Sequence, residues 1–357
     1  MAFSNFFSDL WSNIKKAPTF VPTYIEFTPE QTDDKDIQRF EKMDSNKHYF
    51  FVGVSEMFLS YKRKWHQGFS PMLFSVCGFL YDGKEIEIPY VIGPSLLKEN
   101  QMKLPEGMLF LNTPVVGVHP WRGRDVSLSI ILCRVKKTNY AKKLLNIVEK
   151  VSTSLNFSAA LTNYTKIGHV LFDGIDALLG FEETSPVLGI NNNYGQAAGN
   201  NLRPGYCALI NEEDLDKSKF WVKDKRLHFG ESLETAEPYR ADDYVLYKIG
   251  VSTERYDEDY LSYYDSYKDL YEFIKHQTDL DKKQKENFKS KLRVLAVDIM
   301  TCPDLTSQQA DLVYEEKINE IKKFIEKISK LKGGDQKVKE LGFEDKIMNK
   351  AIDDLGL

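Results

Sequence analysis

Residues 78–89 read GFLYDGKEIEIP, an apolar run and an alternating run joined by Asp82-Gly83. An Asp-Gly pair between two such runs is typical of the tight turn of a β-hairpin, since both central residues of that turn need a positive φ angle. The segment therefore predicts two antiparallel strands.

Strand-like patterns extend from this hairpin over residues 48–135 and return over residues 184–255. Runs of β-branched and aromatic residues bounded by Gly, Pro and Asp are typical of strands. In residues 126–133, large apolar side chains occupy every second position, and Ser, Ser, Ile and Cys occupy the positions between them. This alternation is typical of a strand that is covered on one face and partly covered on the other. The sequence thus predicts a β-rich body with antiparallel pairing.

The pattern changes to helical spacing between these two β regions. Residues 138–152 and 157–179 carry apolar side chains near the spacing of a helix. Because strands precede and follow them, we expect one sheet system completed by both halves. The predicted fold class is α+β, with an antiparallel β-sandwich-like body, a helical hairpin inserted at about residues 138–180, and a helical C-terminal region. Two independent β domains are the alternative.

The C-terminal region differs in composition from the rest of the chain. Residues 251–357 hold 19 basic and 23 acidic residues, so 42 of 107 are charged, whereas 59 of the other 250 are charged. A chain of 357 residues is long enough for two domains. The predicted divisions are residues 1–20, 21–256 and 257–357. Helices are predicted in the last division at about residues 257–276, 281–299, 306–331 and 335–355.

Composition and cysteine spacing exclude several classes of protein. The net charge of −5 gives no overall basic footprint for nucleic acid. The four cysteines are more than 50 residues apart without a CxxC pair, which argues against a zinc cluster or a dithiol redox site. No stretch of 18 consecutive apolar residues and no signal-peptide pattern occurs. We expect a cytoplasmic protein without a metal or cofactor.

The loop at residues 119–125, HPWRGRD, is the densest group of chemically active side chains. The common nucleotide, dinucleotide, hydrolase and metalloprotease motifs are missing from the sequence. In the loop, two guanidinium groups could hold an anion while the indole stacks on a ligand. The alternative is a turn with a local Arg124–Asp125 pair and an unusual backbone angle at Gly123. The candidate ligand-binding residues are His119, Trp121, Arg122, Arg124 and Asp125.

Two amphipathic stretches are candidates for binding a partner. The first is an N-terminal helix with its large apolar residues on one face, which could pack on the protein's own core, a partner or a membrane surface. The second is a tyrosine-rich helix, which could form an interface or pack on the β domain. The residues are Phe3, Phe6, Phe7, Leu10, Trp11 and Ile14 in the first, and Tyr260, Tyr264, Tyr267 and Tyr271 in the second.

These observations favour a non-enzymatic protein-binding or scaffold component of a multi-protein assembly. It would dock through its amphipathic helices onto a protein partner or onto itself, with no catalytic residue assigned and no nucleic acid partner. One alternative is an enzyme or a small-anion-binding protein with its site around residues 119–125. A further alternative is a membrane-active effector that uses residues 1–16 or 157–179.

Overall fold

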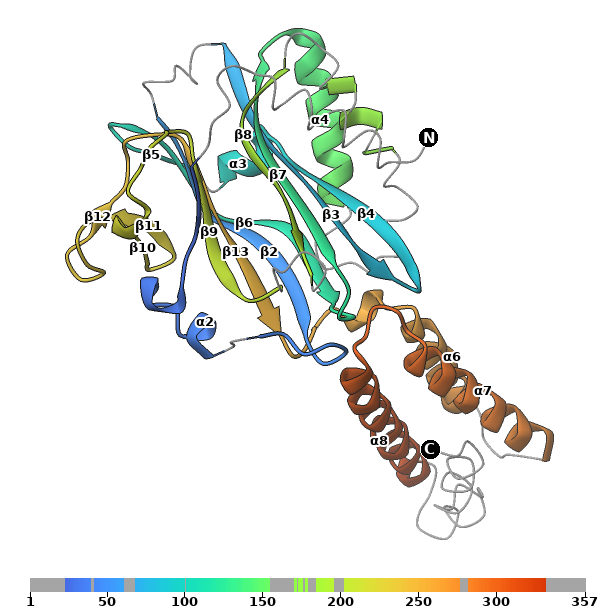
Figure 1. Ribbon diagram of the computed structural model, residues 1–357. Helices are drawn as coiled ribbons and strands as arrows, with labels where there is room; N and C mark the ends of the chain where they lie inside the picture. The colour runs from blue at the N-terminus through green and yellow to red at the C-terminus, as the bar shows by residue number, and fades with distance from the viewer. Residues whose placement is uncertain are drawn as a thin grey trace. The chain divides into compact units, whose positions relative to one another are not determined.

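The structure is a computed structural model with two compact units, Met1–Ser252 and Thr253–Leu357 (Figure 1). The sequence places this division four residues later, after residue 256. The described residues are 23–39, 42–60, 68–99, 101–154, 170–171, 173–175, 177–178, 184–195, 202–276 and 282–331. The fold combines helices with antiparallel sheets, as the sequence predicts at that level of detail.

The first unit contains a six-stranded antiparallel sheet. Its strand order is β1-β9-β13-β2-β6-β5, so strands far apart in the sequence are neighbours. β2 is central and is buried along nearly its whole length, which agrees with its almost continuous apolar sequence. The strands are β1 (Thr23–Glu26), β2 (Tyr49–Ser60), β5 (Gln101–Lys103), β6 (Gly107–Pro120), β9 (Gly205–Ile210) and β13 (Tyr244–Ser252).

A four-stranded antiparallel sheet has the order β4-β3-β7-β8. The predicted hairpin is confirmed, since Tyr81 pairs with Lys84 and the two turn residues have φ angles of 47° and 71°. The positive angles explain why the turn carries Asp82-Gly83. The strands are β3 (Phe69–Tyr81), β4 (Lys84–Ile92), β7 (Val126–Lys136) and β8 (Thr184–Tyr194).

Helices accompany the four-stranded sheet. The helix predicted at residues 138–152 is confirmed as α4 (Asn139–Ser154), which contacts β4 and β7 (Figure 1). The Glu149 carboxylate accepts hydrogen bonds from the backbone N–H groups of Ser95 and Leu96 at 3.2 and 2.8 Å. These groups begin α3 (Pro94–Glu99), so α4 caps the N-terminus of α3. Of the helix predicted at residues 157–179, the described residues, all between 170 and 178, are helical.

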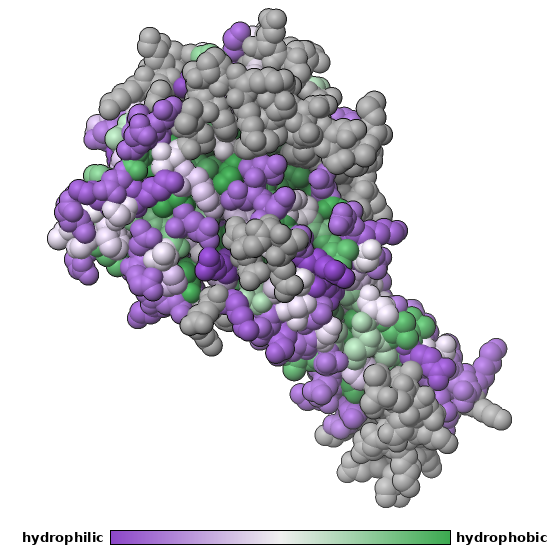
Figure 2. Space-filling model, viewed as in Figure 1, coloured by the Kyte–Doolittle hydropathy of each residue, from purple (hydrophilic) through white to green (hydrophobic). Residues whose placement is uncertain are grey.

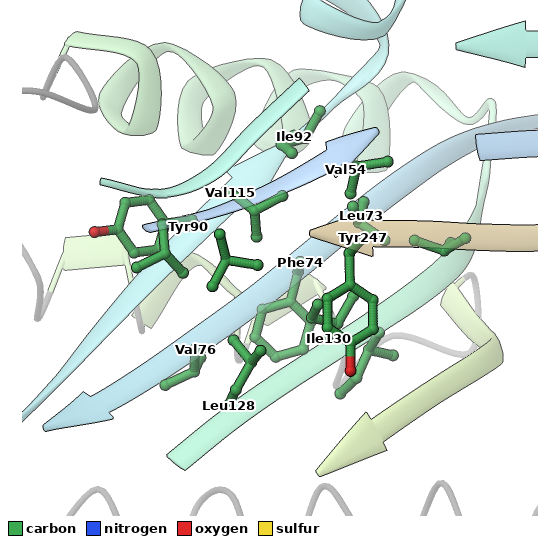
Figure 3. Packing of buried hydrophobic residues seen from close by; sticks show 14 of the residues in the cluster. Val54, Leu73, Phe74, Val76, Tyr90, Ile92, Val115, Leu128, Ile130 and Tyr247 are labelled. Carbon is green, nitrogen blue, oxygen red and sulfur yellow. The ribbon is translucent and has the colours of Figure 1, made fainter. Parts of the chain in front are cut away.

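The main core of the first unit takes side chains from both sheets. Figure 3 shows Val54 and Tyr247 of the six-stranded sheet among Phe74 and Ile130 of the four-stranded sheet. All four side chains are at most 2% exposed. Burying each of these side chains contributes at least about 1.5–3 kcal/mol, so the shared cluster stabilises the packing of the two sheets.

A second core cluster includes residues of the six-stranded sheet and a small three-stranded sheet. The strands of the small sheet are β10 (Phe220–Lys223), β11 (Arg226–Phe229) and β12 (Glu237–Pro238). Phe220 and Tyr239 pack here with ring centroids 5.1 Å apart. Short helical turns lie at η1 (Pro29–Gln31), α2 (Lys35–Arg39) and η3 (Lys217–Lys219).

A buried ion pair joins the segment before α2 to the six-stranded sheet, in which Lys248 lies on β13 and Tyr206 on β9. The Asp34 carboxylate accepts hydrogen bonds from Lys248 Nζ at 2.8 Å and from the Tyr206 hydroxyl at 2.6 Å. Burial alone would raise the pKa of Asp34, but the hydrogen bonds from Lys248 and Tyr206 and the charge of Lys248 outweigh it, so the pKa is lowered. The ionised form of Asp34 therefore stabilises the folded unit.

We expect Asp34→Asn to cost about 1–2 kcal/mol of unfolding free energy at pH 7. Because the pKa of Asp34 is lower in the folded protein than the value of about 3.9 in the unfolded chain, the ionised carboxylate stabilises the fold fully above about pH 3.9. This stabilisation is lost as the pH falls through the pKa of the folded state. The wild type and Asp34→Asn should therefore become equally stable in acid. Urea unfolding followed by tryptophan fluorescence at pH 7, 4 and 2.5 measures it, since all four tryptophans precede residue 253. Asp36→Asn, at an exposed carboxyl nearby, is the control. An equal loss at all three pH values would contradict this assignment.

The second unit is helical in its described residues. It contains η4 (Glu258–Tyr260), α6 (Tyr263–His276), α7 (Lys282–Met300) and α8 (Ser307–Leu331). Ile318 and Ile321, which recur on one face of α8, are 4% and 0% exposed. Thr306 Oγ1 accepts a hydrogen bond from the Gln309 backbone N–H at 3.2 Å, whereas the Gln309 side chain donates to the Arg255 carbonyl. The helix predicted at residues 335–355 lies outside the described residues.

Candidate functional site

The five candidate residues of the 119–125 loop do not line one common pocket. His119 belongs to β6 and is 1% exposed. Its Nε2 atom lies 2.9 Å from the Tyr90 hydroxyl, and its ring stacks on Phe79 with centroids 4.8 Å apart. The imidazole is therefore held inside the core by its neighbours.

Trp121 and Arg122 are bound to nearby chain segments. The Trp121 indole N–H donates to the Arg124 carbonyl at 3.3 Å. Arg122 Nη1 donates to the Asn46 side-chain oxygen at 3.0 Å. Gly123 has a φ of 73°, which is the unusual backbone angle that the turn interpretation expects. These contacts are those of a structured turn.

Arg124 and Asp125 line a groove of about 1030 Å³ beside the β3–β4 hairpin. Glu85 and Glu87 of β4 line the same groove, whereas Arg122 does not. An Arg124–Asp125 ion pair is not among those formed by the described residues. The two arginines therefore do not form a shared clamp for an anion.

The charge of this groove is unfavourable for an anion. Its three carboxyl groups, from Glu85, Glu87 and Asp125, outnumber the one guanidinium. One carboxylate oxygen of Glu87 is buried and has no hydrogen-bond partner among the described residues, and burial raises the pKa of this group. Within the described part of the chain, no group of three or more His, Cys, Asp or Glu side chains could hold a metal ion.

The tyrosine-rich stretch is partly occupied by contacts within the helical unit. Tyr271 stacks on Phe324 of α8 with centroids 3.7 Å apart, and the Tyr267 hydroxyl donates to Glu320 at 2.8 Å. Tyr264 lies next to Tyr267 on the same edge of α6, with centroids 5.8 Å apart. Tyr260 in η4 is 54% exposed. Two of the four candidate tyrosines therefore pack α6 onto α8.

The helical unit also exposes aliphatic side chains that the sequence reading does not single out. Val294 and Val297 of α7 are 49% and 50% exposed, and Leu312 of α8 is 53% exposed. Other apolar residues of α7, such as Leu292 and Leu295, are at most 1% exposed. We refer to Val294, Val297 and Leu312, with the groove described next, as the α7–α8 surface. Figure 2 shows hydrophobic side chains on the surface of the helical unit.

A groove of about 650 Å³ lies between the end of α7 and α8. Met300, Tyr314 and Ile318 form its apolar part, and Asp311 and Glu315 add two acidic groups. Tyr314 is only 8% exposed, and its hydroxyl is buried without a hydrogen-bond partner among the described residues. Asn319 and Lys322 complete the lining. The groove thus combines apolar side chains, the Tyr314 hydroxyl, and two acidic groups against one basic group.

The sequence carries a weak signal for this surface. Val294 and Val297 are three residues apart, so they share a face of α7 that differs from the buried face of Leu292, Leu295 and Ile299. Only the packing of the unit shows which of the two apolar faces is covered. The N-terminal candidates Phe3, Phe6, Phe7, Leu10, Trp11 and Ile14 lie outside the described residues.

None of the described helices is long and apolar enough to cross a membrane. No protein-family model, no curated protein and no solved structure matches this chain.

Proposed function

We propose that this chain is a non-enzymatic protein-binding component of an assembly, which docks an amphipathic helix on its α7–α8 surface. The proposal rests on two observations: Val294 and Val297 of α7 and Leu312 of α8 are exposed, and a partly apolar groove lies between the end of α7 and α8. Helix-in-groove binding uses an apolar face of this kind, with anchors at helical spacing on the partner.

The state of the thiols supports a binding role over thiol chemistry. All four cysteines are buried and free. Burial raises the pKa of Cys207 to about 11 and that of Cys133 to about 12, and it also raises the pKa of Cys77 and Cys302. A thiol with a raised pKa is a poor nucleophile at neutral pH, because the thiolate is the reactive form.

The size of the exposed patch constrains its partner. Covering three half-exposed aliphatic side chains contributes about 2–4 kcal/mol per copy, or about 4–8 kcal/mol of gross burial in a symmetric dimer. A micromolar complex needs about 8 kcal/mol after the costs of association, so the patch cannot support a symmetric dimer by itself. The partner must therefore bring large apolar anchors, and an aromatic side chain that buries 150–250 Å² supplies about 4–6 kcal/mol each.

The N-terminal segment of a second copy fits this description. Its sequence predicts an amphipathic helix with Phe7 and Trp11 on the apolar face. Lys15 and Lys16 follow at its end and complement the acidic Asp311 and Glu315 of the groove. We therefore propose self-association, in which residues 3–16 of one copy occupy the α7–α8 surface of another.

Light scattering of the full chain over a range of concentrations tests this function. We expect the weight-average mass to rise above the monomer value of 41.2 kDa. The double variant V294K/V297K should weaken association about 100-fold, because it removes apolar area and places positive charge opposite Lys15 and Lys16. Phe7→Ser with Trp11→Ser should have a similar effect.

Mixing the two double variants provides the decisive comparison. The V294K/V297K variant keeps an intact N-terminal helix, and the Phe7→Ser, Trp11→Ser variant keeps an intact α7–α8 surface. If the helix of one copy binds the surface of another, each variant alone should be monomeric and the mixture should form a dimer. Ile147→Lys, at a side chain of α4 that is 59% exposed, is the matched control and should associate normally. A wild-type chain that stays monomeric at all concentrations, or a mixture that does not assemble, would overturn the proposal.

The fold interpretation that accompanies this proposal is a β-sandwich with an inserted helical hairpin. Its support is the core cluster to which both sheets contribute and the position of α4 between β7 and β8 in the chain. In this arrangement the inner faces of the two sheets form one core.

A further inference from the structure

A cavity of about 620 Å³ lies in the β-rich unit and is separate from the α7–α8 surface. Phe27, Ile37 and Ile249 give it apolar walls, and Tyr194 and Cys207 bring polar atoms to it. Cavities of about 300–1,000 Å³ with apolar walls and a few polar groups are typical of small-molecule sites. We propose that this cavity binds a small uncharged molecule with an apolar body and one hydroxyl or carbonyl group.

The hydroxyl of Tyr194 is the group that would recognise the polar end of the ligand. Tyr194 is 3% exposed, and its hydroxyl lies 3.4 Å from the Tyr247 hydroxyl and 3.5 Å from the Asn192 side-chain nitrogen. Hydrogen bonds between hydroxyl groups are usually about 2.7–2.8 Å long. Both contacts are therefore weak. The Tyr194 hydroxyl also interacts with the Tyr24 hydroxyl and the Cys207 sulfur, so a ligand hydroxyl or carbonyl would join this loosely bonded polar cluster at the cavity.

The buried polar groups at the cavity are uncharged at neutral pH. Burial raises the pKa of Tyr194 to about 12 and that of Cys207 to about 11. The Tyr24 hydroxyl donates to the Cys207 sulfur at 3.4 Å, which keeps the thiol within a neutral cluster. An ionised ligand would lose its hydration here without gaining an opposite charge, which costs several kcal/mol.

The charged residues of the cavity lie at its rim and compensate each other. Arg203 Nε is 3.6 Å from Glu26 Oε1, and the two side chains are 62% and 37% exposed. Because this pair is neutral overall and is partly in water, it does not select an anion or a cation. The size of the cavity and its neutral polar cluster therefore define the class of ligand.

Cys207 offers a reporter of occupancy, which is used at mildly alkaline pH because its raised pKa leaves little thiolate at neutral pH. Methyl methanethiosulfonate, a small uncharged reagent, forms a methyl disulfide with a thiolate and releases methanesulfinate. We would measure the rate of this modification at Cys207 in the full chain by peptide mass spectrometry. Modification of Cys77, which is 0% exposed and does not line the cavity, reports unfolding of the same unit.

Two matched probes distinguish an uncharged ligand from a charged one. 4-Methylphenol has an apolar ring and one hydroxyl, whereas 4-methylbenzoate has the same ring and methyl group with a carboxylate. We expect millimolar 4-methylphenol to slow the modification of Cys207 several-fold, because it fills the cavity and shields the thiol. The same concentration of 4-methylbenzoate should leave the rate unchanged, and neither probe should alter the rate at Cys77.

Two variants test the residues. Tyr194→Phe keeps the ring and removes the hydroxyl, so the dissociation constant of 4-methylphenol from the protection curve should rise about three- to tenfold. Ile249→Trp should fill the cavity and abolish protection, with tryptophan fluorescence checking the fold. If Ile249→Trp does not fold, Tyr194→Phe decides the question. The proposal is overturned if 4-methylphenol gives no protection, if 4-methylbenzoate protects equally, or if Tyr194→Phe binds 4-methylphenol as the wild type does.

Discussion

The variant Glu56→Leu is expected to lose about 3–5 kcal/mol of the unfolding free energy of the β-rich unit. Glu56 is 0% exposed. Its Oε1 atom pairs with Arg240 Nη2 at 2.8 Å, and its Oε2 atom accepts hydrogen bonds from the Leu227 N–H and the Tyr244 hydroxyl, both at 2.8 Å. Removing the carboxylate leaves a guanidinium that is largely buried and two donors without their acceptor.

Urea unfolding followed by tryptophan fluorescence measures this loss. The double variant Glu56→Leu with Arg240→Leu is the informative comparison, because it removes the uncompensated charge along with the carboxylate. We expect it to recover at least about half of the loss, since a buried ion pair replaced by apolar side chains is often nearly neutral in stability. A Glu56→Leu variant that loses less than about 1 kcal/mol would show that the network contributes little.

The variant Arg255→Met is expected to unfold much of the helical unit while the β-rich unit stays folded. The Arg255 side chain is 1% exposed and lies between two carboxylates. Its Nε atom donates to Asp257 at 2.6 Å, and its Nη1 atom donates to the Asp304 carbonyl at 3.1 Å and lies 3.6 Å from the Asp304 carboxylate. Without the guanidinium, the buried Asp304 carboxylate and the largely buried Asp257 carboxylate both lose this positive charge, which costs about 3–5 kcal/mol.

Circular dichroism at 222 nm reports the helical unit, and tryptophan fluorescence reports the other unit. We expect the helical signal to fall or to melt at a lower temperature, with the fluorescence transition unchanged. Arg255→Lys should lie between the wild type and Arg255→Met, because lysine keeps the charge but not the planar group that reaches both carboxylates. A helical melting transition that is unchanged in Arg255→Met would contradict the role assigned to this residue.

The parts of the fold that depend on short-range patterns can be predicted from the sequence. The Asp82-Gly83 hairpin follows from two residues that tolerate a positive φ angle. α4 and α8 follow from apolar residues at helical spacing. These features depend on neighbours within about two helical turns or across one tight turn, and such neighbours are visible in the sequence.

The candidate site depends on packing that short-range patterns do not contain. The 119–125 loop places five reactive side chains close together in sequence, yet His119 turns into the core while Arg122 and Arg124 face different spaces. Only His119 lies in β6, where its side chain is buried, whereas the other four residues lie in the turn that follows the strand. Proximity in sequence therefore does not bring these side chains together. In contrast, Val294 and Val297 are ordinary aliphatic residues that stand out only because α6 and α8 do not cover them.

The Glu56 network illustrates the same limit. The sequence predicts strand-like structure over residues 48–135, and β2 runs from Tyr49 through Glu56 to Ser60. The register of β2 against β13 shifts between Val54 and Glu56, so the alternation of faces changes at that point. A charged residue suggests a solvent-exposed position, whereas Glu56 is buried within β2 and has Arg240, Leu227 and Tyr244 as partners.

The sequence by itself determined the hairpin, the strand-rich and helical divisions of the chain, and the contrast in charge density between them. The tertiary structure alone decided which residues meet, such as Glu56 with Arg240, 184 residues away, and which apolar faces stay uncovered. The physical reason is that hydrophobic burial is non-directional and fixes only which residues avoid water. The partner of each buried polar group depends on strand order and register, which the whole chain sets together.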